Sequence, residues 1–186
     1  MGYDPAYRRT ALELADYLAE NGDELVYGGA NVGLMKVLAD RMLEREKKVI
    51  GIMPAKLVEK EVAHHNLSRM IIVDTLAQRK ERMVAISDLF VVLPGGFGTL
   101  DELSEIMTFN QLRISDKPLG ILNVRGYFDH LLQFFDHAVG EGFVRKEHRD
   151  NLVVSDDILP LFQRMKNYRP LVMGKWIEDI KTESKQ

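Results

Sequence analysis

The sequence predicts an α/β fold in which a doubly wound parallel sheet carries helices on both faces. Short apolar runs of strand length alternate with segments whose apolar residues recur at helical spacing. Two of these runs end in glycine-rich turns that lead directly into a helix. Of the 186 residues, 46% are hydrophobic and 28% charged, which is typical of a globular chain. We therefore expect a single domain over residues 1–186.

The expected strands are short and aliphatic, and they cover residues 25–27, 49–53, 70–73, 89–93 and 119–122. The expected helices cover residues 11–19, 32–45, 76–86, 99–112 and 127–139. Asn21 and Gly22 end the first helix, and Pro54 stops the second strand. Strands and helices that alternate in this way form parallel sheets. After Asn167 the pattern weakens, and residues 182–186 are expected to fray.

The first element is unusual for this fold. A doubly wound sheet normally begins with a strand, whereas this chain opens on a helix. We expect either a sheet that is short by one strand or a further segment upstream.

Composition excludes several classes of function. The formal net charge is −3, so no basic surface for nucleic acid or an anionic membrane is expected. The absence of cysteine excludes disulfides and thiolate chemistry. No apolar run approaches the roughly 20 residues of a membrane helix, and the start lacks a signal-peptide pattern, so a cytoplasmic location is expected. Glu61, His64 and His65 lack convincing ligand spacing, and no metal site is expected.

The two glycine-rich turns are the strongest functional signal. One contains Gly28, Gly29 and Asn31, and the other runs from Gly95 to Thr99. In a parallel sheet both turns lie at the carboxyl edge, where backbone N–H groups and helix starts bind phosphate. The alternative is that each glycine only permits a tight turn. The strand after the first loop ends without an acidic residue, and neither loop continues into Gly-Lys-Ser/Thr, which disfavours dinucleotides and Walker-type ATPases.

Charged residues near these turns could perform chemistry. Glu102 follows Thr99 by three residues, which is also the spacing of a capping box. A carboxylate in a first helical turn is stabilised as the anion, so Glu102 would suit a general base or the stabilisation of a cation. Arg79 is expected near the same sheet edge, where a guanidinium could hold a phosphate. Lys80 and Arg82 are interpreted as a solvated basic face.

The segment from Pro94 to Glu102 resembles the proline-glycine-glycine-x-glycine-threonine-x-x-glutamate signature of the LOG (Lonely Guy) family, the cytokinin riboside 5′-monophosphate phosphoribohydrolases. The first glycine loop, the Arg79-Lys80 helix and the segment from Asp116 to Tyr127 also resemble that family. The resemblance implies a Rossmann-like homodimer that hydrolyses purine nucleoside 5′-monophosphates to free base and ribose 5-phosphate, without a metal or organic cofactor. Some members carry the label lysine decarboxylase, but no pyridoxal-phosphate site can be read here.

By position, Arg79 and Glu102 match the family's catalytic pair. The residues expected to contact substrate, from the two loops and the resemblance, are Gly28, Gly29, Asn31, Glu61, Lys80, Gly95, Gly96, Phe97, Gly98, Thr99 and Thr108. This sequence departs from the family in three ways: the opening strand with its serine–glycine turn is absent, and Ala30 and Arg113 stand where many members carry glycine. A non-catalytic nucleotide or molybdenum-cofactor carrier of the same fold is the alternative function.

Overall fold

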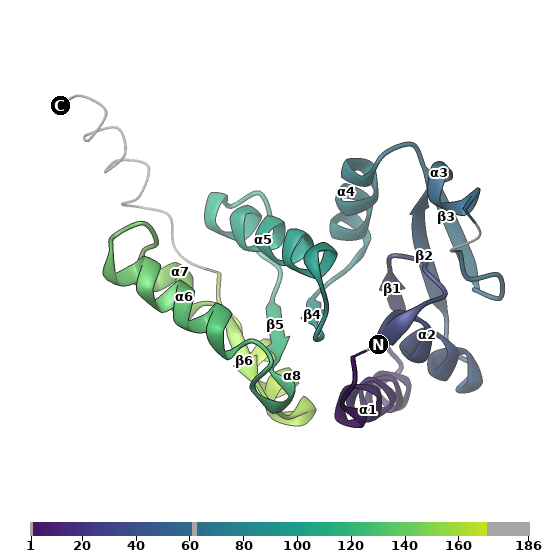
Figure 1. Cartoon of the computed structure of the whole chain (residues 1–186), viewed down its shortest axis with the longest axis horizontal. Coiled ribbons are helices and arrows are strands. Elements are labelled where there is room, and N and C mark those ends of the chain that lie inside the picture. Colours follow the sequence, from purple (N-terminus) through teal and green to yellow (C-terminus); the bar gives the residue numbers. More distant parts are fainter. Residues whose placement is uncertain (1, 61–62, 171–186) are drawn as a thin grey trace.

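A computed structural model describes residues 2–60 and 63–170 (Figure 1). The strands are β1 (Leu25–Tyr27), β2 (Val49–Pro54), β3 (Arg69–Val73), β4 (Phe90–Val92), β5 (Leu119–Leu122) and β6 (Val153–Ser155). The helices are α1 (Pro5–Asn21), α2 (Gly33–Glu44), α3 (Ala55–Val58), α4 (Leu76–Ile86), α5 (Phe97–Leu112), α6 (Asp129–Gly140), α7 (Lys146–Asp150) and α8 (Ile158–Lys166), with a 3₁₀ turn η1 (Val124–Gly126) before α6. All five expected strands and all five expected helices are present, whereas β6 and α8 were not predicted.

The strands form two parallel sheets of three strands each. One has the order β1-β2-β3 and the other the order β4-β5-β6, and every pairing within them is parallel. Strands β1 and β4 therefore stand at the ends of their sheets and face the middle of the molecule, as Figure 1 shows. The predicted α/β class with parallel strands is confirmed, and the sheet is divided in its centre.

Helices cover both faces of the two sheets, as predicted. On one face α1, α2 and α8 pack on the strands, through core residues that include Leu14, Leu38 and Leu161. On the other face α5 and α6 pack on β4 and β5 around Leu103, Ile106 and the partly buried side chains of α6, while α4 contacts β1, β2 and β3. The core is apolar and almost fully buried on both faces, which is the environment that central parallel strands require.

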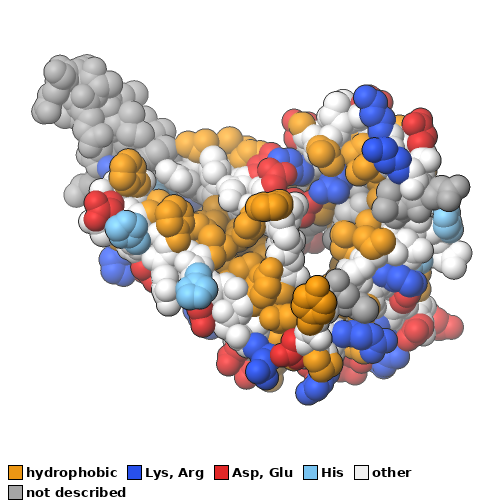
Figure 2. Space-filling model, viewed as in Figure 1, with side chains coloured by type: hydrophobic (Ala, Val, Ile, Leu, Met, Phe, Trp, Pro, Cys, Tyr) orange, Lys and Arg blue, Asp and Glu red, His pale blue; other side chains and the backbone are white. Residues whose placement is uncertain are grey.

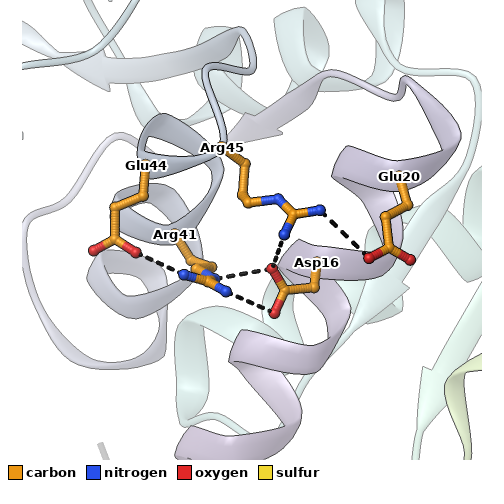
Figure 3. Close-up of polar contacts among 5 residues, drawn as sticks. All are labelled: Asp16, Glu20, Arg41, Glu44 and Arg45. Atoms are coloured by element: carbon orange, nitrogen blue, oxygen red, sulfur yellow. Dashed lines mark hydrogen bonds and ion pairs between the residues drawn. The ribbon is translucent and has the colours of Figure 1, made fainter.

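An ion-pair cluster fixes α1 against α2 (Figure 3). The guanidinium of Arg41 donates to both carboxylate oxygens of Asp16, over 2.9 and 3.2 Å, and also to Glu44. Arg45 contacts Asp16 and Glu20 from the end of α2. The bidentate contact favours one angle between the two helices. The side chains are partly solvated, so each ion pair contributes little to stability.

No helix among residues 2–60 and 63–170 is long and apolar enough to cross a membrane.

Candidate active site

The two glycine loops open into one large cavity. It has a volume of about 930 Å³ and extends between β1 and β4 up to the carboxyl ends of both strands. Of the predicted site residues, those that line it are Gly28, Lys80, Gly95, Gly96, Thr99 and Glu102. Residues that are far apart in sequence therefore meet in one hollow, as the rule for parallel sheets requires.

The second loop presents the start of α5 without a side-chain cap. Helix α5 begins at Phe97, with Gly96 as its N-cap residue and no side-chain hydrogen bond at the cap. The first intrahelical bond of this turn is that from Leu100 N–H to the Gly96 carbonyl. The N–H groups of Phe97, Gly98 and Thr99 thus have no carbonyl of their own helix to pair with, and a helix start of this kind favours an anion.

The structure excludes the capping-box alternative for Thr99 and Glu102, because α5 starts at Phe97, two residues before the expected start at residue 99. Thr99 lies inside the first turn, and its hydroxyl folds over Gly95, where a Cβ would stand 2.1 Å from the Thr99 Oγ1. Glu102 lies in the second turn rather than the first. The stabilisation of an anion by the helix start, which was expected for a first-turn carboxylate, therefore does not apply to it. Its carboxylate is free for another partner.

That partner is Arg79 of α4, whose NH2 nitrogen donates to the Oε1 oxygen of Glu102. The side chain of Arg79 is 15% exposed and that of Glu102 is 31% exposed, so the pair is largely shielded from water, and Glu102 lines the cavity while Arg79 lies behind it. Burial raises the pKa of the Glu102 carboxyl above its ordinary value, although the charge of Arg79 acts in the opposite direction. The Nε of Arg79 is buried and has no partner within the described residues.

Lys80 has two carboxylate partners, which corrects its interpretation as a solvated residue. Its Nζ lies 3.1 Å from Asp101 Oδ1 and 3.0 Å from Glu105 Oε2. These hydrogen bonds raise the pKa of Lys80, Glu105 contributing more than Asp101, so the amine is cationic. Together with the Arg79–Glu102 pair, they join α4 to α5 across the division between the two sheets.

The first glycine loop lies directly against Arg79. A Cβ on Gly28 would stand 3.2 Å from the NH1 nitrogen of Arg79, so the missing side chain is what lets the guanidinium approach. Gly29 has φ +78°, a conformation that other residues adopt only with strain. Its carbonyl accepts from the His64 N–H at 2.9 Å, and the Asn31 Oδ1 is buried without a partner among the described residues. The loop is therefore held by backbone contacts and keeps polar groups available.

The remaining predicted residues lie further away or outside the described ranges. Phe97 is 92% exposed, and its side chain does not line the cavity. Thr108 lies in a separate groove between α5 and α6, and its hydroxyl donates to the Ser104 carbonyl. Within one chain the structure does not bring Thr108 to Glu102. Glu61 lies outside the described residues.

Tyr127 is a site residue that the sequence reasoning did not single out. It lines the cavity, and its hydroxyl donates to the Gly95 carbonyl at 2.7 Å, which fixes the second loop. The signal was its place just after β5, at the carboxyl edge of the sheet. Side chains at that edge are candidates for the site whatever their type.

The fold requires glycine at one position of the second loop and not at the other two. Gly95 is needed by the protein's own packing, because a Cβ there would overlap Thr99. A Cβ on Gly96 or Gly98 would meet no atom within 4 Å, and neither residue has a positive φ. Neither space nor backbone strain within the chain demands glycine at these two positions. Open space beside free amides instead favours close approach of a ligand.

We therefore expect Gly98→Ala to separate stability from binding. Alanine is the better helix former by about 0.5–1 kcal/mol, so the free energy of unfolding should stay the same or rise. The added methyl stands beside the uncapped amides at the start of α5, and KM for an anionic substrate should rise at least ~10-fold, because about 1.4 kcal/mol of binding is lost. Urea titration and steady-state kinetics check both. Gly140→Ala, also without a neighbour within 4 Å but at the end of α6, is the matched control and should leave KM unchanged.

The fold and the site together define a class: a Rossmann-like α/β protein with an uncapped helix start and an arginine–carboxylate pair at the carboxyl edge of its strands. The family model described as "Possible lysine decarboxylase" matches residues 35–165. Cytokinin riboside 5′-monophosphate phosphoribohydrolase LOG2 of Arabidopsis thaliana is 41% identical over 169 residues, which cover 91% of this chain and 79% of the relative. LOG5 of the same plant is 37% identical over the whole chain and 83% of its own length. The chain belongs to this LOG family.

Solved structures confirm the fold. The molybdenum cofactor binding protein of Rippkaea orientalis has a TM-score of 0.66 at 23% identity and covers 88% of both chains. The molybdenum cofactor carrier protein of Chlamydomonas reinhardtii has a TM-score of 0.65 at 19% identity, with 89% of both chains covered. At these identities the likeness concerns architecture alone.

Proposed function

We propose that this chain hydrolyses the N-glycosidic bond of purine nucleoside 5′-monophosphates, with adenine or a cytokinin as the base. Water adds its hydroxyl to C1′ of the ribose and its proton to the leaving base, so the products are the free base and ribose 5-phosphate. The observation that carries the proposal is the Arg79–Glu102 pair beside the uncapped start of α5, at a cavity that Gly96, Thr99 and Glu102 line. Its support from relatives is the curated phosphoribohydrolase activity named for LOG2 and LOG5.

The proposed binding mode starts at the second loop. The 5′-phosphate is held by the amides of Phe97, Gly98 and Thr99, whose combined dipole favours an anion. Gly96 and Gly98 leave room for this approach. The unpartnered Nε of Arg79 and its closeness to Gly28 allow the guanidinium to contact phosphate or base while it holds Glu102. Lys80 adds positive charge at the same wall.

Glu102 supplies the chemistry in this proposal. As the C1′–N bond lengthens, positive charge develops on the ribose ring, and a nearby carboxylate stabilises it more than it stabilises the neutral ground state. The same carboxylate can orient a ribose hydroxyl or the attacking water. Arg79 lowers the pKa of this carboxyl and so favours its ionised form, whereas burial favours the protonated form. The reaction as proposed needs no metal or cofactor.

Base release from AMP tests the function and separates it from the carrier alternative. The full chain is incubated with AMP or with isopentenyl-AMP, and free base and ribose 5-phosphate are quantified. The proposal expects both products in equal amounts. The alternative, a non-catalytic nucleotide or molybdenum-cofactor carrier, expects tight binding and no free base. The ratio of kcat/KM for the two nucleotides identifies the preferred base.

Assembly as a homodimer belongs to the same proposal. Exposed large hydrophobic side chains gather on α5, α6 and the segments that follow them, and Figure 2 shows hydrophobic side chains over this part of the surface. They include Leu112 (42% exposed), Ile114 (65%), Phe134 (61%) and Phe143 (87%). A contiguous apolar face of this kind is typical of a subunit interface. Thr108 lies in the groove on this face, where a second copy would cover it.

A cytoplasmic location completes the proposal, because a nucleoside monophosphate is ionised and crosses a bilayer only at great cost.

A further inference from the structure

The side chain of His64 is buried behind the first glycine loop and does not line the cavity. It is only 5% exposed, and it belongs to the segment between α3 and β3. The backbone N–H of His64 donates to the Gly29 carbonyl at 2.9 Å, and an isolated antiparallel bridge joins the neighbouring residues Ala30 and Ala63. This segment therefore runs alongside the loop and holds it at two adjacent positions.

The imidazole of His64 connects the same segment to α2, the helix that follows the loop. Its Nε2 lies 2.8 Å from Asp40 Oδ1, and its Nδ1 accepts the Asn66 N–H at 3.2 Å. A backbone N–H can only donate, so Nδ1 carries the lone pair and the ring proton sits on Nε2, which donates to the carboxylate. One buried residue thus holds the loop through its backbone and α2 through its side chain.

The carboxyl of Asp40 is well suited to hold this ring. Burial raises its pKa, but the hydrogen bonds from Lys36 and His64 outweigh burial and keep the pKa below its ordinary value. Asp40 therefore accepts as a carboxylate, and its bond to Nε2 is charge-assisted. The second carboxylate oxygen accepts from Lys36 at 2.6 Å, on the exposed side of α2.

The loop that His64 holds is also the surface against which Arg79 packs. A Cβ on Gly28 would stand 3.2 Å from the NH1 nitrogen of Arg79, and a Cβ on Gly29 would stand 3.1 Å from the Met70 Sδ. The loop thus has little clearance on either side. A shift of the Gly29 carbonyl would move the backbone on which the guanidinium rests, and with it the group that donates to Glu102.

We propose that His64 and Asp40 are positioning residues for the first glycine loop. Through Gly28 they fix the direction in which the Arg79 guanidinium meets Glu102. This inference rests on the proposed hydrolysis for its kinetic consequence. Neither His64 nor Asp40 lines the cavity, so neither contacts the substrate. The phosphate is assigned to the second loop, so a misplaced guanidinium should lower kcat and leave KM nearly unchanged.

Asp40→Ala tests the pair at a partly exposed helix position, where alanine is the best helix former and the variant should fold. We expect kcat for AMP to fall at least ~10-fold, because small misplacements of a reacting group are costly. KM should stay within about 2-fold of wild type. Lys36→Ala removes the other partner of the same carboxylate and should change neither constant. His65→Ala, at the exposed neighbouring position, is the control for the segment.

Substitutions at position 64 show which ring nitrogen matters. His64→Gln keeps an amide N–H donor at the reach of Nε2, and it should recover most of the kcat that His64→Ala loses. His64→Asn keeps an acceptor near Nδ1 but is too short to reach Asp40, so it should be as slow as His64→Ala. The double variant His64→Ala/Asp40→Ala should lose no more than one single variant, since the two residues act as a unit.

Two NMR measurements test the same positioning without catalysis. In Asp40→Ala, amide exchange at residue 64 should speed up at least ~10-fold, and the side-chain Nε resonance of Arg79 should shift. Lys36→Ala should show neither change. If the wild-type chain releases no base from AMP, the proposed reaction is wrong, and these two measurements alone decide the positioning role.

Unchanged exchange at residue 64 and an unmoved Arg79 resonance in Asp40→Ala would overturn the proposal. So would a kcat equal to that of wild type in this variant, or losses in the double variant that simply multiply. A fall in Tm with kcat and the Arg79 resonance unchanged would reduce His64 and Asp40 to a structural contact.

Discussion

Glu102→Gln should lower the turnover of AMP at least ~100-fold, the scale of one strong electrostatic contribution to a transition state. Glutamine keeps the shape and the hydrogen-bonding oxygen that Arg79 contacts, but it removes the negative charge. Because α5 is capped by Gly96 and not by Glu102, the loss of a helix cap does not confound the result. The turnover is measured as the rate of adenine release at saturating AMP. Glu44→Gln removes a carboxylate on α2, remote from the cavity, and should leave turnover unchanged.

The same variant has a defined effect on the pH dependence of stability. Burial raises the pKa of Glu102 in the folded protein above its value in the unfolded chain, which is about 4.3. The folded state then holds this proton more tightly, so the group's contribution to stability is full below pH 4 and is lost as pH rises through the folded pKa. Wild type should therefore lose stability relative to Glu102→Gln as the pH rises above about 4, as measured by urea titration at several pH values.

A turnover near that of wild type would leave Glu102 as a structural partner of Arg79 alone. A stability difference that is flat with pH would mean that the carboxyl is equally solvated in both states. These two outcomes are independent, because the first concerns charge in the transition state and the second concerns burial of the ground state.

The elements that were predictable from sequence are those with strong local signals. The expected helix over residues 76–86 and the expected stop at Pro54 agree with the structure within one residue, whereas α1 begins at Pro5, six residues before the expected start at residue 11. Strand β6 was missed although it is as long as β1 and β4, since Val153–Ser155 is not followed by a glycine-rich turn of the kind that marks the ends of those two strands. Helix α8 was not predicted, although Leu161, Phe162 and Met165 are buried at helical spacing. Pro160 suggested the end of a helix, whereas it lies in the first turn, where proline is tolerated.

The site shows the same limit at the level of single residues. The convergence of the two glycine loops followed from topology alone, because parallel strands present their carboxyl ends at one edge. The ionisation of Glu102 could not be predicted from the sequence, since it depends on where α5 begins and on how deeply Arg79 covers the carboxyl. Likewise, the sequence indicated that Lys80 is a solvated surface cation. Its partners Asp101 and Glu105 belong to a different helix, so the pairing could not be seen in the local sequence. Pairings between helices require the tertiary structure.

Removing Arg79 should be more damaging than removing both members of the ion pair. Arg79→Met leaves the carboxylate of Glu102 in a shielded place without its cation, and we expect a loss of about 1–3 kcal/mol in the free energy of unfolding at pH 7. In the double variant Arg79→Met/Glu102→Gln no buried charge remains, so much of that loss should be recovered. Urea titration of all four proteins gives the coupling free energy directly.

The pH dependence of the single variant identifies the cause of its loss. Without Arg79 the main factor that lowers the pKa of Glu102 is gone, and the pKa should rise further. Lower pH then neutralises the carboxyl and should restore stability to Arg79→Met but not to the double variant, which has no carboxyl there. Equal losses in the single and double variants at every pH would contradict a shielded charge. Arg41→Met breaks the solvated pair with Asp16, and its cost should be smaller, because exposed carboxylates exchange a protein partner for water.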